Sequence, residues 1–174
     1  MIAADIEALA GDDAAAEREL RWGYDTLERM GEKGARAVVA AYLAESLSRR
    51  GRDDEAASFA EIAATLAAAD DLVPQVLCRC VRAKVLARRD ILDQAEQLAR
   101  EAAAMVQSTD FPDLQALTLL SLAEVLASTA PAESARLIDR ARKIYERKGN
   151  IVAGRRIVPR STSRGGADEA GRRT

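Results

Sequence analysis

The residues of this chain that could do chemistry are few, and their spacing suits helix ends better than an active site. Three aspartate pairs, Asp12-Asp13, Asp53-Asp54 and Asp70-Asp71, look like the paired carboxylates of acid–base catalysts. Each pair stands where a helix is expected to begin or end, and there a carboxylate caps the helix and complements its dipole. The chain has no histidine, the most frequent general acid or base near neutral pH. The sequence therefore predicts no catalytic residue and no enzyme.

The two cysteines, Cys78 and Cys80, do not form a convincing site either. Side chains two residues apart on a helix diverge by about 200°, so a disulfide between them is geometrically poor. Without histidine or a further thiol, a zinc site would need unusual ligands. The chain also lacks a glycine-rich loop ending in Lys-Ser or Lys-Thr that could hold phosphate. We expect both cysteines to be small packing residues, and we expect no metal and no cofactor.

The elements that position these residues are predicted to be helices throughout. Alanine is abundant and aromatic residues make up only 3% of the chain, a composition that favours helix over sheet. Strand-forming residues are scattered and never alternate over a useful length. The expected fold class is therefore all-α.

Small residues recur along the chain with a period of 39 to 40 residues. Alanine allows two antiparallel helices to approach closely without the helix cost of glycine. A period of this length is the signature of stacked helical hairpins. The positions are Ala44, Ala56 and Ala63, then Ala83, Ala95 and Ala102, and then Ala123 and Ala135, with the last match one residue early on Ala141. Gly51 marks the first turn, and Asp90 stands at its place in the second copy.

The first copy resembles the tetratricopeptide repeat in Leu43-Ala44, the turn glycine Gly51, Glu55-Ala56 and Ala63. The second copy departs from that pattern, and the third has Leu122-Ala123 and Ser134-Ala135 but no turn glycine. The resemblance covers roughly residues 36–150. It implies a right-handed α-solenoid of about three helical hairpins.

The expected organisation has three parts. A first helix is predicted to begin after Asp12 or Asp13 and to run to about Met30. Trp22 is expected to cover the edge of the stack, and the apolar stripe is Leu20, Tyr24, Leu27 and Met30. Residues 1–34 form the N-terminal capping helix region. Residues 35–150 hold the hairpins 35–70, 73–108 and 112–149. Residues 151–174 are predicted to form a short helix and then a disordered basic tail.

Charge is distributed unevenly over these parts. From Asn150 onward six arginines outnumber Asp168 and Glu169, which gives +4, so residues 1–149 carry −6. An acidic body argues against a nucleic-acid surface. No apolar run approaches the roughly 20 residues that span a bilayer, and the N-terminus has acids where a signal peptide needs a basic segment. We therefore expect a cytoplasmic protein that does not bind a membrane and whose body does not favour nucleic acid. The arginine-rich tail after Asn150 stays open as a candidate for nucleic-acid association.

The resemblance also implies where a partner would bind, because in this family the first helices of successive hairpins line a concave groove. A peptide or partner helix could lie there. Alternatively, Leu77, Cys80, Leu117 and Leu120 simply pack against the neighbouring hairpin, and Glu45, Lys84 and Glu124 form a solvated ladder. The predicted groove residues are Val38, Ala41, Glu45, Arg49, Leu77, Cys80, Lys84, Arg88, Leu117, Leu120 and Glu124.

A narrower resemblance concerns the long first helix, the hairpins of about 40 residues and the ending YERKGN. It is similar to the repeat region of large bacterial ATPase-type and adenylate-cyclase-type signalling regulators, whose ATPase and cyclase modules are not found here. The sequence thus favours a non-enzymatic protein-interaction scaffold. The alternative is a detached or truncated sensor segment of such a regulator. Uncapped ends and an alanine-rich surface also predict a homo-oligomer.

Overall fold

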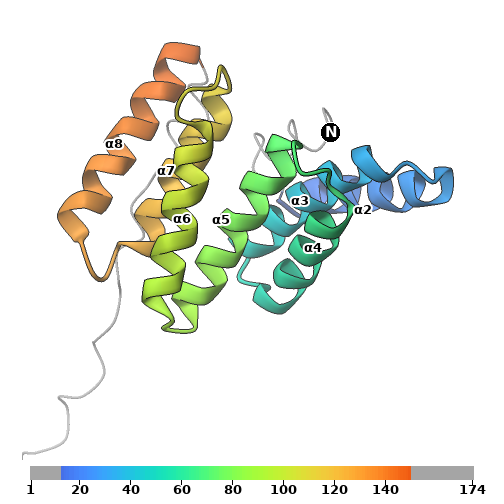
Figure 1. The fold of residues 1–174 in the computed structure, drawn as a ribbon, viewed down its shortest axis with the longest axis horizontal. Helices are drawn as coiled ribbons and strands as arrows, with labels where there is room; N and C mark the ends of the chain where they lie inside the picture. The colour runs from blue at the N-terminus through green and yellow to red at the C-terminus, as the bar shows by residue number, and fades with distance from the viewer. Residues whose placement is uncertain (1–12, 150–174) are drawn as a thin grey trace, which may run out of the picture.

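The computed structural model describes residues 13–149, and these residues form seven α-helices and no strand (Figure 1). The all-α prediction is confirmed for this part of the chain. No helix within it has both the length and the apolar character needed to cross a membrane. The predictions for residues 1–12 and 150–174 lie outside the described residues. The helices are α2 (Asp13–Met30), α3 (Lys33–Arg49), α4 (Asp53–Leu66), α5 (Leu72–Arg88), α6 (Leu92–Val106), α7 (Pro112–Val125) and α8 (Pro131–Lys148).

Six of the helices pack as consecutive pairs, α3 with α4, α5 with α6, and α7 with α8. The first helices of the pairs also pack on one another, α3 against α5 and α5 against α7, while α4 contacts α5 and α6 contacts α7. Helix α2 packs on α3. Figure 1 shows the result, with α2 at one side of the molecule and α8 at the other.

The turns between paired helices account for the small-residue period and for its one-residue shift in the third hairpin. Gly51 has a φ of 74° and Asp90 a φ of 63°, so the first two turns use a residue in the left-handed region. Glycine adopts this region freely, and aspartate is among the residues that tolerate it. The third turn, between α7 and α8, has no residue with a positive φ, and it ends at Ala130, the N-cap of α8, which has a φ of −140°.

This different turn corrects the predicted register of α8. Ala135, expected to pack inside the hairpin, is exposed, whereas Ser134 is buried at 6% exposure. The Ser134 hydroxyl donates a hydrogen bond of 2.7 Å to the carbonyl oxygen of Ala123 on α7. Ser134 and Ala141 are separated by the same seven residues as Ala56 and Ala63, so the small-residue pattern continues from Ser134.

The remaining small residues lie where helices approach each other. Seven alanines of the pattern are at most 2% exposed, which matches the expectation that they permit close packing. Large side chains such as Leu43, Leu47, Leu77 and Leu126 fill the adjacent space and are also fully buried. The seven alanines are Ala44, Ala56, Ala63, Ala83, Ala95, Ala102 and Ala123.

Helix α2 has the predicted bounds but a shorter apolar stripe than expected. Leu20 is buried, and the Tyr24 ring meets the Phe59 ring of α4 edge to face at 5.4 Å. Met30 is 68% exposed and Trp22 is 66% exposed, so neither covers the packed helices as predicted. Leu27 is half-buried and packs with Tyr24 against the core, so three of the four predicted stripe residues attach α2.

Candidate partner-binding surfaces

Several of the predicted groove positions have no surface to offer a partner. Ala41, Leu77 and Cys80 are 0% exposed, so assigning them to a partner-contacting surface is wrong. The alternative, in which Leu77 and Cys80 pack inside the protein, describes their environment. Val38, Leu117 and Leu120 are half-buried on α3 and α7. Packing inside the protein thus takes up Ala41, Leu77 and Cys80, whereas Val38, Leu117 and Leu120 keep part of their surface.

Glu45 and Lys84 neutralise each other across the α3–α5 contact. The Lys84 ammonium donates to both carboxylate oxygens of Glu45, at 2.7 and 2.6 Å. The two side chains are 10% and 3% exposed, so this pair is not part of a solvated ladder. Removing either partner would leave a buried charge without compensation. Both charges therefore hold the two helices together and are not available to a partner.

Arg88 joins the three hairpins at the same end of these helices. Its guanidinium donates to the Ser48 carbonyl oxygen at 2.8 Å and to Glu124 at 2.6 Å, and it also pairs with Asp53. Glu124 is exposed but already bonded, and Arg49 lies 3.7 Å from Asp13. The predicted charges of the groove are thus mostly engaged in contacts between helices.

The two thiols lie in the protein interior. Burial raises the pKa of Cys80 to about 12 and the pKa of Cys78 to about 11. The Cys78 thiol donates a hydrogen bond to the carbonyl oxygen of Ala60, 3.1 Å away on α4. Because the thiolate is the reactive form, these environments suit packing and not nucleophilic chemistry.

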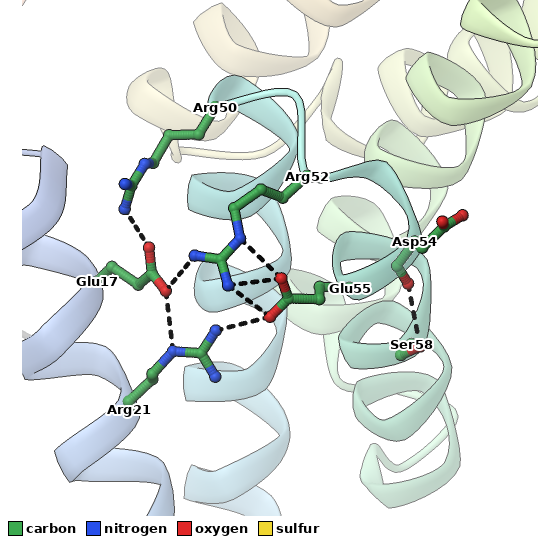
Figure 2. A network of polar contacts seen from close by, with 7 residues as sticks. All are labelled: Glu17, Arg21, Arg50, Arg52, Asp54, Glu55 and Ser58. Atoms are coloured by element: carbon green, nitrogen blue, oxygen red, sulfur yellow. Dashed lines mark hydrogen bonds and ion pairs between the residues drawn. The ribbon is translucent and has the colours of Figure 1, made fainter.

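A polar network fixes α2 to the first hairpin (Figure 2). Arg21 and Arg52 donate to Glu17 at 2.9 and 2.7 Å, and Arg50 pairs with the second oxygen of the same carboxylate. Arg52 also holds Glu55 through two hydrogen bonds of 2.7 Å, and Arg21 donates to Glu55 at 3.0 Å. Three arginines from α2 and the α3–α4 turn therefore surround two carboxylates.

The network favours the charged form of Glu17. Burial alone would raise the pKa of this carboxyl, but the hydrogen bonds and charges of Arg21 and Arg52 outweigh it and hold the pKa below its ordinary value. Both Glu17 oxygens are already bonded. The network can thus position α2, but it leaves the carboxylate no capacity for acid–base work.

An open cavity lies between α6 and α8, on α7, and was not among the predicted sites. Its volume is about 780 Å³, within the range of ligand-binding clefts. The floor is formed by Thr118, Leu119 and Leu122 of α7 together with Leu137 of α8. Arg100, Ala103, Ala104 and Gln107 form the α6 wall, and Arg140, Lys143, Ile144 and Arg147 belong to the α8 wall. We refer to this cavity as the α6–α8 groove.

Charges at this groove are only partly paired. Arg100 on α6 bonds Glu133 on α8 at 3.0 Å, which joins the two walls near the start of α8. Lys143 pairs with Asp139 at 2.7 Å on its own helix. Arg140 and Arg147 form no ion pair within residues 13–149. The groove therefore presents uncompensated positive charge beside an apolar floor.

A second cavity occupies the equivalent place one hairpin earlier, between α4 and α6 on α5. It is smaller, at about 550 Å³, and Arg82, Arg89, Val85 and Leu98 are among its lining residues. Arg89 pairs with Asp54 at 2.7 Å. Arg82 forms no ion pair within residues 13–149, so the α4–α6 cavity differs from the α6–α8 groove chiefly in its smaller volume.

Sequence reasoning missed the α6–α8 groove because it looked only at the first helix of each hairpin. One signal was present: Arg136, Arg140, Lys143 and Arg147 follow each other at intervals of four, three and four residues, which places them on one helix face. Whether this helix face lines a cavity depends on the helix that packs beside it, and the sequence pattern does not specify that helix.

Comparison with known proteins does not add a family to this picture, since no protein-family model matches the chain and no curated protein matches it.

Proposed function

We propose that this chain is a non-enzymatic scaffold of the tetratricopeptide type, a right-handed α-solenoid that binds a segment of a partner protein. The face that binds is the α6–α8 groove, in place of the surface predicted along α3, α5 and α7. The observation that carries the proposal is an open cavity of about 780 Å³ with an apolar floor and unpaired charge on its α8 wall.

The order of helix contacts supports the scaffold part of the proposal. Each pair packs on the next through its first helix, as stacked repeats do, and such stacks present extended binding surfaces. A groove between two helices suits a helical or extended segment whose apolar side chains enter it. The candidate partner is therefore a protein or peptide, and a second copy of the chain is one such candidate.

Blocking the groove tests this function. Ala104 is an exposed residue of the α6 wall, so Ala104→Trp would fill the groove without disturbing the core. The matched control is Ala64→Trp, at an exposed alanine of α4 outside both cavities. Thermal melting would establish that both variants are folded.

The readout is the affinity of a partner identified by capture with the wild-type chain and then purified. We expect Ala104→Trp to weaken binding at least about tenfold, which corresponds to about 1.4 kcal/mol, and Ala64→Trp to leave it unchanged. Equal affinity of all three proteins would overturn the assignment of the groove.

A further inference from the structure

Helix α8 is positively charged within an acidic molecule. It contains six basic and three acidic residues, a net charge of +3, although residues 1–149 together carry −6. A local reversal of sign at the wall of a cavity selects the sign of what the cavity binds. The charge of α8 therefore bears on the chemistry of the groove's occupant.

The basic residues of α8 are concentrated on one face. Arg136, Arg140, Lys143 and Arg147 lie within a narrow arc of the helix and are all exposed, and we call this row the basic stripe of α8. Three of its members also line the α6–α8 groove. The stripe therefore runs along one edge of the groove.

The opposite wall and the floor have a different character. Ala103 and Ala104 of α6 and Gln107 directly after it carry no charge, and the charge of Arg100 on the same wall is paired with Glu133. The small alanine side chains allow a backbone to approach closely. Leu119, Leu122 and Leu137 form the apolar floor. A ligand that fits all three surfaces needs an apolar face toward the floor, close approach of its backbone to the α6 wall, and acidic residues toward α8.

We propose that the α6–α8 groove binds an amphipathic helix of a partner protein that carries glutamate or aspartate along one edge. The acidic edge lies against the basic stripe of α8, and the apolar face lies on Leu119, Leu122 and Leu137. This inference rests on the proposed scaffold function and adds the chemical class of the partner.

Nucleic acid fits the same surface less well. A phosphate backbone has no apolar face for the floor, and its binding relies on clustered positive charge. The groove lining also includes the carboxylates of Glu133 and Glu146, and the surrounding body is acidic. The charge pattern selects an occupant with a few acidic residues in a row over a uniformly anionic polymer.

The test uses the full chain and defined fluorescent peptides as long as α8, 18 residues. One peptide carries leucines on one face and glutamates along the edge, and a second carries lysines in place of the glutamates. The test variant is Arg140→Glu with Arg147→Glu. The control is Arg18→Glu with Arg82→Glu, two exposed arginines outside the α6–α8 groove that give the same change in net charge.

We expect the glutamate peptide to bind the wild type and the control within about twofold of each other, and the test variant at least about tenfold more weakly. Raising the salt from about 0.05 to about 0.5 M should weaken the wild-type complex, because the Debye length shortens. The lysine peptide should bind less tightly than the glutamate peptide.

Each of the other possible results would overturn a specific part of the proposal. Equal binding of both peptides, or no effect of the test variant, overturns the acidic-partner inference and leaves the scaffold function standing. If neither peptide binds but a purified partner remains sensitive to Ala104→Trp, the acidic-partner inference is again overturned and the scaffold function stands. Retention of a DNA duplex by the wild type that the test variant loses would show nucleic acid as the occupant. A partner insensitive to Ala104→Trp would overturn the proposed function itself.

Discussion

The α3–α5 contact and the α6–α8 groove both place charged side chains beside apolar ones, yet one is closed and the other is open. In the α3–α5 contact, Lys84 meets Glu45 at 2.6 Å and both are buried. At the groove, Arg140 and Arg147 line the same cavity as Ala103 and Ala104 of α6 and form no ion pair within the described helices. The closed contact thus buries a matched charge pair, whereas the groove keeps two arginines without a partner although Arg100 and Glu133 join its walls at 3.0 Å.

The largest predicted effect comes from removing one charge on the closed side. Lys84→Ala leaves the Glu45 carboxylate buried and unpaired, so it should lower the free energy of unfolding by about 3–5 kcal/mol. Arg140→Ala, on the open side, should change it by no more than about 0.5 kcal/mol. Urea denaturation of the two variants and the wild type measures both values.

A double variant distinguishes the loss of the Lys84–Glu45 ion pair from the loss of side-chain packing. Lys84→Met with Glu45→Leu removes both charges while keeping similar side-chain volume, and such replacements are often neutral or stabilising. We therefore expect most of the stability lost in Lys84→Ala to return. A double variant as unstable as Lys84→Ala would mean that the pair is not the source of the closure.

A smaller effect is expected from a buried and an exposed alanine of the same helix, α8. Ala141 of α8 is 0% exposed, so Ala141→Leu should overpack the hairpin and cost about 1–3 kcal/mol. Ala135 is exposed on the same helix, and Ala135→Leu should change stability by no more than about 0.5 kcal/mol. Thermal or urea unfolding decides the point, and a reversed order of the two effects would restore the register predicted from the sequence.

The smallest effect concerns Glu17, whose arginine partners are partly exposed and contribute about 1 kcal/mol at neutral pH. Because its pKa is held below the ordinary value of about 4.3, the charged form stabilises the fold above that pH, and this contribution is lost as pH falls through the folded-state pKa. Glu17→Gln should therefore be less stable than wild type at neutral pH.

The difference between Glu17→Gln and the wild type should shrink in acid. Denaturation at a series of pH values below neutrality measures it, with Glu19→Gln, at an exposed residue of the same helix, as the control. A constant difference down to acidic pH would show that the arginines do not act on the charge of Glu17.

What the sequence determined by itself depends on local geometry. The spacing of apolar and small residues predicted an all-helical chain, and the bounds of α2, Asp13–Met30, agree with the predicted ones. Asp90 was identified as the counterpart of Gly51, and both have a positive φ, which glycine adopts freely and aspartate tolerates. These features need only the neighbouring residues, so a linear pattern contains them.

What only the tertiary structure decided depends on which helices face each other. Glu45 and Lys84 are 39 residues apart, so their pairing cannot be read from either helix alone. The turn before α8 moved Ser134 inside and Ala135 outside, because a one-residue change in a turn rotates the following helix by about 100°. The α6–α8 groove exists because the helices before and after α7 both pack on it without closing over it, and the pattern of a single helix does not contain that relation.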